Sequence, residues 1–145
     1  MRFSESGDNW VEITLPIKTF SEANGGAKKS FKFKGQSWTK SEHWTDRYKR
    51  HKRQKGMVGL TLRPFKNQLK IPCVITLTRF APRKLDKFDN LPMSFKWILD
   101  AICEVITGDY RPGRADDTIE DDIDVIYKQV ISKEYAVKIR IQMQN

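Results

Sequence analysis

The chain has 145 residues, of which 39% are hydrophobic and 11% aromatic, enough for one domain with a core of its own and too many for a disordered chain. Its 27 Lys and Arg against 18 Asp and Glu give a net charge of +9, which favours an anionic partner such as nucleic acid without identifying it. No apolar run approaches the roughly 18 residues of a membrane span, and no targeting segment is visible. We therefore expect a soluble, cytoplasmic protein that does not enter a membrane.

The first forty residues predict little regular structure. Residues 1–9 are polar, and we expect them to be loose. Apolar and polar side chains alternate over residues 10–17, which predicts a strand. Residues 19–36 are rich in glycine and lysine, and the alternation at 31–34 predicts a short edge strand protected by its lysines.

Residues 41–56 predict a strongly basic helix that begins at Ser41 as N-cap and ends at Gly56. Trp44 and Tyr48 are four residues apart and would share one face of it. Two interpretations stay open. The helix is either a solvated surface element pinned by this aromatic pair, or a surface that contacts the phosphate backbone of nucleic acid. The cations available for such contacts are Lys49, Arg50, Lys52, Arg53 and Lys55.

The second half of the chain predicts a central strand, a helix and two further strands. Residues 69–80 are rich in β-branched side chains and apolar on both faces, as in a central strand. Residues 90–107 predict a helix, and residues 123–131 and 135–143 predict a hairpin without an Asn-Gly turn signal. The order of elements predicts a single α+β domain over residues 1–145, in which two main helices pack on a mixed sheet.

Two isolated cysteines, Cys73 and Cys103, lie within apolar runs. Neither belongs to a Cys-x-x-Cys or Cys/His pattern that would bind a metal. We expect both to be buried, reduced thiols.

The helix predicted over residues 90–107 separates apolar from charged side chains. At about 100° per residue, one stripe contains the apolar residues. They are Leu91, Phe95, Ile98, Leu99, Ile102, Val105 and Ile106. Asp89, Lys96 and Asp100 fall on the opposite side. Either Asp89 is only an N-cap and Lys96 with Asp100 only a surface pair, or the helix presents these groups together for chemistry.

Further charges near this helix favour the chemical interpretation. Asp86 lies in a loop that follows the predicted central strand, and the acidic run 115–124 follows the helix. The cations that flank the first loop are Arg79, Arg83 and Lys84. Hard carboxylate oxygens from two loops could hold Mg²⁺ or Mn²⁺, and such ions can activate water for phosphodiester hydrolysis. Lys96 could then neutralise charge that develops on the phosphate.

These residues resemble the RusA family of Holliday-junction resolvases, many of whose members come from phages and prophages. The matching motifs are Asp89-Asn90-Leu91, Lys96 four residues before Asp100-Ala101, and the pair Asp116-Asp117. The strand that ends in Leu15-Pro16 and the tail around Tyr127-Lys128-Gln129 are also similar. The resemblance covers most of the chain and is strongest over residues 84–129. The aspartate pair Asp86-x-x-Asp89 is one residue longer here than in the best-known members.

The resemblance implies a RusA-like fold and a Mg²⁺-dependent (or Mn²⁺-dependent) endodeoxyribonuclease that cuts branched DNA as a homodimer. It implies Asp86, Asp89 and Asp117 as metal ligands, with Asp116 as the second choice for the third ligand. It also implies Lys96 as the catalytic lysine. The alternative is a non-catalytic, basic nucleic-acid-binding protein on the same scaffold. A dimeric structural protein of a mobile element is a third, weaker interpretation.

Overall fold

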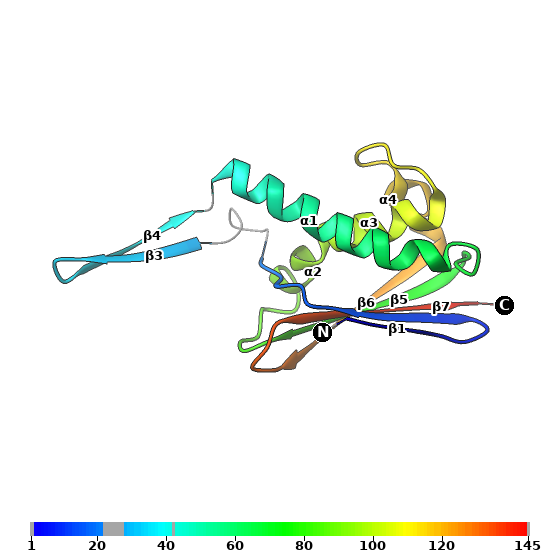
Figure 1. Cartoon of the computed structure of the whole chain (residues 1–145), viewed down its shortest axis with the longest axis horizontal. Coiled ribbons are helices and arrows are strands. Elements are labelled where there is room, and N and C mark those ends of the chain that lie inside the picture. The colour runs from blue at the N-terminus through cyan, green and yellow to red at the C-terminus, as the bar shows by residue number, and fades with distance from the viewer. Residues whose placement is uncertain (1, 22–27, 42, 145) are drawn as a thin grey trace.

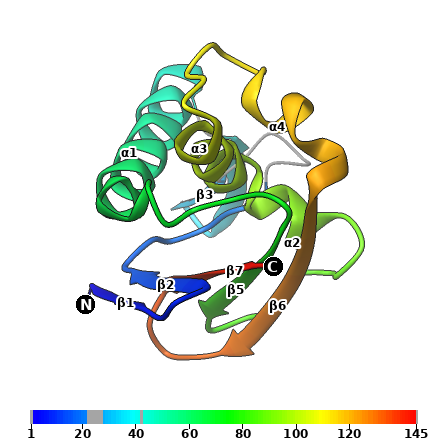
Figure 2. The same ribbon diagram turned by 90° about the vertical axis from the view of Figure 1, so that its right-hand side faces the viewer.

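A mixed five-stranded sheet with the strand order β1-β2-β7-β5-β6 forms the base of the molecule (Figure 1). The structure is a computed structural model and describes residues 2–21, 28–41 and 43–144. The strands are β1 (Phe3–Ser6), β2 (Trp10–Leu15), β5 (Cys73–Ala81), β6 (Ile123–Ile131) and β7 (Ala136–Met143). Two long helices, α1 (Trp44–Leu62) and α3 (Lys96–Thr107), lie over one face of this sheet (Figure 2). The predicted α+β class, with a mixed sheet and two main helices, is confirmed.

The core lies between the sheet and these two helices. Alternate side chains of β2 and β7 point into it, so that Val11, Ile13 and Ile139 are fully buried. Ile98 and Ile102 of α3 are also fully buried and close the core from above. Both cysteines are buried and free, which confirms that prediction.

The two strands after residue 122 do not form the predicted hairpin. β5 lies between them, parallel to β6 and antiparallel to β7. Residues 132–135 cross the end of β5, where the Ser132 amide donates to the carbonyl of Ala81 at 2.9 Å. The prediction was wrong because it paired neighbours in sequence. β5 has a hydrogen-bonded neighbour along each edge, and none of its nine residues is exposed.

Helix α1 begins later and ends later than predicted. Ser41, the expected cap, belongs to a strand, and Gly56, the expected stop, lies inside the helix. A glycine inside a helix costs about 1 kcal/mol relative to alanine. Burial of Val58 and Leu62, each 0% exposed, outweighs that cost and continues the helix by six residues beyond Gly56.

The helix predicted over residues 90–107 is divided. A short helix α2 (Asn90–Ser94) precedes α3, and Phe95 separates them with φ −103° and ψ 1°. Phe95 is itself fully buried, so the predicted apolar stripe still faces the core. Asp89, however, does not share a continuous helix with Lys96, so a rotation of about 100° per residue does not relate the directions of their side chains.

The remaining elements lie outside the sheet-and-helix core. They are the strands β3 (Lys28–Phe33) and β4 (Gln36–Ser41), the helix α4 (Ala115–Thr118), and the 3₁₀ turns Arg63–Phe65 and Glu120–Asp122. β3 and β4 pair with each other as a hairpin that projects away from the body (Figure 1). The structure therefore has a two-stranded arm where the sequence predicted one short strand, and β1 pairs with β2 where residues 1–9 were expected to be loose. Among the described residues, none of the helices combines the length and the apolar character of a membrane span.

Candidate functional site

The loop between β5 and α2 is ordered by the carboxylate of Asp86. Its Oδ1 accepts the Asp89 amide at 2.9 Å, and its Oδ2 accepts the Asn90 amide at 3.2 Å and the Asn90 side-chain amide. These bonds, the one from Asp89 first, lower the pKa of Asp86. Asp86 therefore stays ionised and exposed while it caps the start of α2.

Asp89 has a different local role. It occupies the N-cap position of α2, yet its side chain forms no capping hydrogen bond. The capping function has passed to Asp86, three residues earlier. The interpretation of Asp89 as a simple N-cap is therefore not supported, and its exposed carboxylate is available for another ligand.

Two side chains from the sheet tie down this loop. The Gln129 side chain of β6 accepts the Leu85 amide at 3.0 Å and donates to the Leu85 carbonyl at 2.8 Å. Arg79 of β5 donates to the Arg83 carbonyl at 2.7 Å and to the hydroxyl of Thr19 at 3.0 Å. Arg79 is only 6% exposed, and burial lowers its pKa. These contacts fit a structural role for Arg79 better than the predicted direct contact with DNA.

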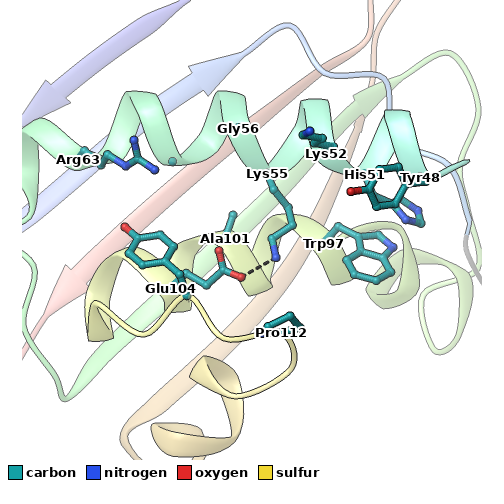
Figure 3. Close-up of a pocket in the computed structure, with 12 residues that line it drawn as sticks. Tyr48, His51, Lys52, Lys55, Gly56, Arg63, Trp97, Ala101, Glu104 and Pro112 are labelled. Carbon is teal, nitrogen blue, oxygen red and sulfur yellow. Dashed lines mark hydrogen bonds and ion pairs between the residues drawn. The ribbon is translucent and has the colours of Figure 1, made fainter. Parts of the chain in front are cut away.

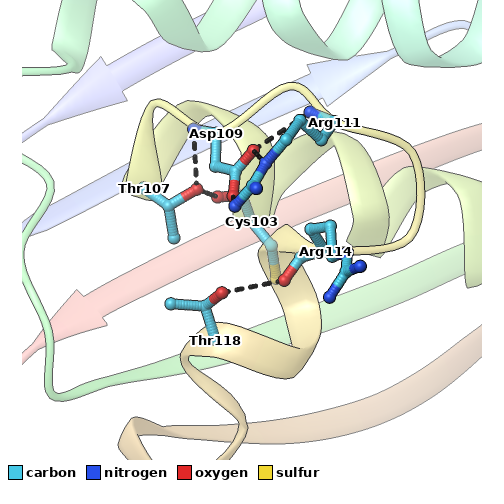
Figure 4. A network of polar contacts seen from close by, with 6 residues as sticks. All are labelled: Cys103, Thr107, Asp109, Arg111, Arg114 and Thr118. Carbon is cyan, nitrogen blue, oxygen red and sulfur yellow. Dashed lines mark hydrogen bonds and ion pairs between the residues drawn. The ribbon is translucent and has the colours of Figure 1, made fainter.

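The acidic segment after α3 folds back onto that helix. Ala115 and Ile119, both 3% exposed, pack against the fully buried Cys103. Figure 4 shows the turn that permits this return, with Asp109 and Arg111 paired at its tip and Arg114 next to α4. The Arg111 guanidinium donates to Asp109 at 2.8 Å and 3.0 Å, and these bonds lower the pKa of Asp109 to about 2.

This return brings the charge of Asp116 of α4 within electrostatic range of Asp100 of α3. Burial raises the pKa of Asp100, and the negative charge of Asp116 raises it further. Lys55 and Lys96 act in the opposite direction, so both lysines lie near the same carboxylate. Asp100 therefore lies within electrostatic range of Asp116 and Glu104 and of two lysines, one of them the predicted catalytic Lys96.

The other predicted ligands lie on exposed segments. Asp117 of α4 is exposed, as are Asp86 and Asp89. Within the described ranges, no three His, Cys, Asp or Glu side chains are close enough together to hold a metal ion. The ligand set Asp86, Asp89 and Asp117 therefore stays a prediction, whereas the carboxylates that act on each other electrostatically include Asp100 and Asp116.

Some of the cations predicted to contact DNA are exposed, and others are buried or paired with another side chain of the protein. The exposed ones are Lys49, Lys52, Arg53, Arg83 and Lys84. Arg50 is 7% exposed, and its guanidinium lies over the ring of Phe20 at 4.9 Å. The ammonium of Lys55 lies 2.5 Å from the carboxylate of Glu104. A basic surface on α1 and the Arg83–Lys84 loop is thus present, but smaller than predicted.

The aromatic pair on α1 does not pin the helix. Trp44 is 72% exposed and Tyr48 is 62% exposed. The buried residues of the helix are others, namely Arg50, Gln54, Val58, Gly59 and Leu62. The interpretation of α1 as a solvated helix anchored by this pair is wrong, and the exposed aromatic rings lie beside exposed cations instead.

Sequence reasoning missed a groove between α1 and α3, which we call the α1–α3 groove (Figure 3). It has a volume of about 500 Å³. Its lining residues are Tyr48, His51, Lys52, Lys55, Gly56, Gly59, Arg63, Trp97, Ala101, Glu104, Tyr110 and Pro112. The sequence signal for it was the pair of glycines on α1, three residues apart, opposite Ala101 of α3.

The sequence matches no known protein-family model, and no curated protein shows significant similarity to it. Residue chemistry and geometry, together with the motif resemblance, therefore have to support any assignment of function.

Proposed function

We propose that the protein is a metal-dependent endodeoxyribonuclease that resolves Holliday junctions or related branched DNA in recombination and repair. The observation that supports this most is the return of the acidic segment onto α3. Ala115 and Ile119 pack against Cys103 of that helix, and the charge of Asp116 acts on Asp100, a residue of the motif that resembles the RusA family. An exposed basic surface on α1, the helix that packs beside α3, would bind the DNA backbone.

The chemistry of the donors fits Mg²⁺ or Mn²⁺. These ions bind through one or two carboxylates and complete their coordination with water and substrate phosphates. Two neighbouring carboxylates that repel each other, such as Asp100 and Asp116, are stabilised by a cation. Asp117 is the next residue after Asp116 within α4, and the carboxylate of Asp89 forms no capping hydrogen bond. A bound metal would supply Lewis-acid activation of the phosphodiester and of water.

The protein's own residues would position the reacting groups and neutralise the charge on the phosphate. Lys96 would compensate the negative charge that develops on the phosphate during hydrolysis. Asp86, held by its bonds to Asp89 and Asn90, would keep the loop and the Asp89 carboxylate in place. A four-way junction requires two symmetric cuts, so we propose that the enzyme acts as a homodimer.

Cleavage of an immobile four-way junction, with and without Mg²⁺, tests the proposal. We expect cleavage by the wild type only with metal, and none by Asp89→Asn or Asp116→Asn. Both variants should still bind the junction, and more tightly, because a carboxylate that repels phosphate is removed. Lys96→Ala should cut about 10²-fold more slowly. Asp8→Asn, which neutralises an exposed aspartate between β1 and β2, is the matched control and should cut like wild type.

A non-catalytic DNA-binding protein on the same scaffold is the second candidate. It is favoured by the lack, among the described residues, of three ligating side chains in one cluster. In that case wild type leaves junctions, flaps and forks uncut with either metal, and binding is indifferent to the aspartate substitutions.

A further inference from the structure

The α1–α3 groove has a chemical character distinct from that of the acidic site. Aromatic rings and cations line it, and its one carboxylate, that of Glu104, is already paired with Lys55 at 2.5 Å. We propose that this groove binds an unpaired nucleotide of single-stranded DNA, with the base on Tyr48 and the phosphate near Lys52. The proposal rests on DNA as the substrate of the proposed function, but it requires no cleavage.

Small residues make room for a ligand between the two helices. Gly56 and Gly59 of α1 and Ala101 of α3 line the groove. A Cβ atom placed on Gly56 would meet no atom within 4 Å. The volume of about 500 Å³ lies within the range typical of small-molecule sites, so a planar base with its sugar fits.

The aromatic side chains provide stacking surfaces. The ring of His51 stacks on Trp97 with 4.2 Å between ring centroids and 25° between ring planes, and the ammonium of Lys96 lies over the indole at 5.4 Å, so the orientation of the indole is fixed. Tyr48 is 62% exposed and Tyr110 is 49% exposed. In Figure 3, Tyr48, His51 and Trp97 gather at the same end of the groove. Such surfaces bind bases of any sequence because every base has a π-face.

The charges at the rim favour an anionic ligand. Lys52 is exposed, and the guanidinium of Arg63 lies over the Tyr110 ring at 5.7 Å. The ion pair between Lys55 and Glu104 leaves the groove with a net positive charge from the other two cations. A phosphate next to a stacked base satisfies both features, whereas a neutral apolar ligand would use only the rings.

We infer that the bound nucleotide is unpaired because its base must expose a face in order to stack on an aromatic ring. In a duplex, both faces of a base are covered by its neighbours, so a base reaches an aromatic wall only when it is unpaired and unstacked. Single strands expose their bases, and proteins that bind them combine aromatic rings with a basic groove, as this groove does. The phosphate contacts alone would not distinguish single strands from duplex.

Fluorescence anisotropy of a dye-labelled ten-residue oligothymidylate, in EDTA at low salt, tests the proposal. Tyr48→Ser should weaken binding about 5- to 150-fold, the range expected for loss of one stacked base. Gly56→Met should weaken it similarly by filling the groove, while Gly56→Ala leaves space and should bind like wild type. Tyr135→Ser removes a tyrosine that does not line the groove and is the matched control. Thermal unfolding of each variant confirms that it is folded.

The proposal is overturned if Tyr48→Ser and Gly56→Met bind the oligonucleotide like wild type, even where Mg²⁺-dependent junction cleavage persists. It is also overturned if both variants lose duplex binding as much as single-strand binding, since unpaired bases are then not what the groove recognises. Loss of single-strand binding by both, in a protein that cuts no junction, supports the groove and refutes the nuclease proposal. The two proposals therefore fail separately.

Discussion

Replacing Ile119 by alanine tests how the acidic segment is held on α3. Ile119 is 3% exposed and packs with Ala115 against Cys103, in a cluster separate from the main core. Truncating a buried isoleucine to alanine costs about 2–5 kcal/mol. α4 has four residues and is too short to persist without tertiary contacts. The lost free energy should therefore favour the local detachment of α4 from α3. The state in which α4 is detached should become at least about 30-fold more populated.

Hydrogen–deuterium exchange measures this opening segment by segment. In Ile119→Ala, the amides of residues 115–122 should exchange at least about 30-fold faster, while those of β5 keep their wild-type rates. Junction cleavage should fall as well, although no acidic residue has been changed. Ile131→Ala removes the same atoms from a side chain that is 56% exposed, and it should change stability by no more than about 0.5 kcal/mol.

Two results would refute this reasoning. Unchanged protection over residues 115–122 would mean that Ile119 does not anchor the segment. A uniform loss of protection that includes β5 would mean that the segment is part of the global folding unit and does not open by itself.

Three further predictions concern other groups. Asp100→Asn should raise the melting temperature at neutral pH, because the pKa of Asp100 is raised in the folded protein and its ionised form therefore destabilises the folded state. This gain in melting temperature should vanish below pH 3.8, where the carboxyl is protonated in both the folded and the unfolded state. Melting curves of wild type and variant at a series of pH values would measure it. Gln129→Ala should lower the free energy of unfolding by about 1–2 kcal/mol, because two hydrogen bonds to Leu85 are lost, and a denaturant titration would measure this. Limited digestion should cleave the loop that follows Leu85 faster than in wild type. Unchanged digestion would contradict the anchoring role of Gln129. Cys73 and Cys103, whose pKa values burial raises to about 11 and about 12, should resist a thiol reagent at pH 8 in the native protein and react fully in urea.

The helical part of the core could be predicted from sequence because its signal is periodic. The apolar stripe of residues 90–107 survives the break at Phe95, since that residue belongs to the stripe and is itself buried. The end of α1 could not be predicted locally. Gly56 is a stop signal by itself, and only burial of Val58 and Leu62 overrides it.

The sheet order and the acidic site were harder to predict for the same physical reason. Both depend on contacts between segments far apart in sequence. No pattern in the sequence of residues 123–143 indicates that β5 lies between β6 and β7. The acidic run has only Ala115 and Ile119 as buried anchors, too few for a periodic pattern, so only the acidic residues and the resemblance indicated that this run would return to the helix.

The position of β7 has a consequence for how the chain folds. β7 lies between β2 and β5, and its pairing joins Trp10 to Gln142 across nearly the whole chain. Until β7 has formed, β1 and β2 have no hydrogen-bonded connection to β5 and β6 within the sheet. Pairings of such long sequence separation close large loops before they gain contacts, which slows folding relative to a helical bundle of the same size. During synthesis, the β1–β2 hairpin emerges before β7, so the edge of β2 that pairs with β7 must remain unpaired until that strand has been made.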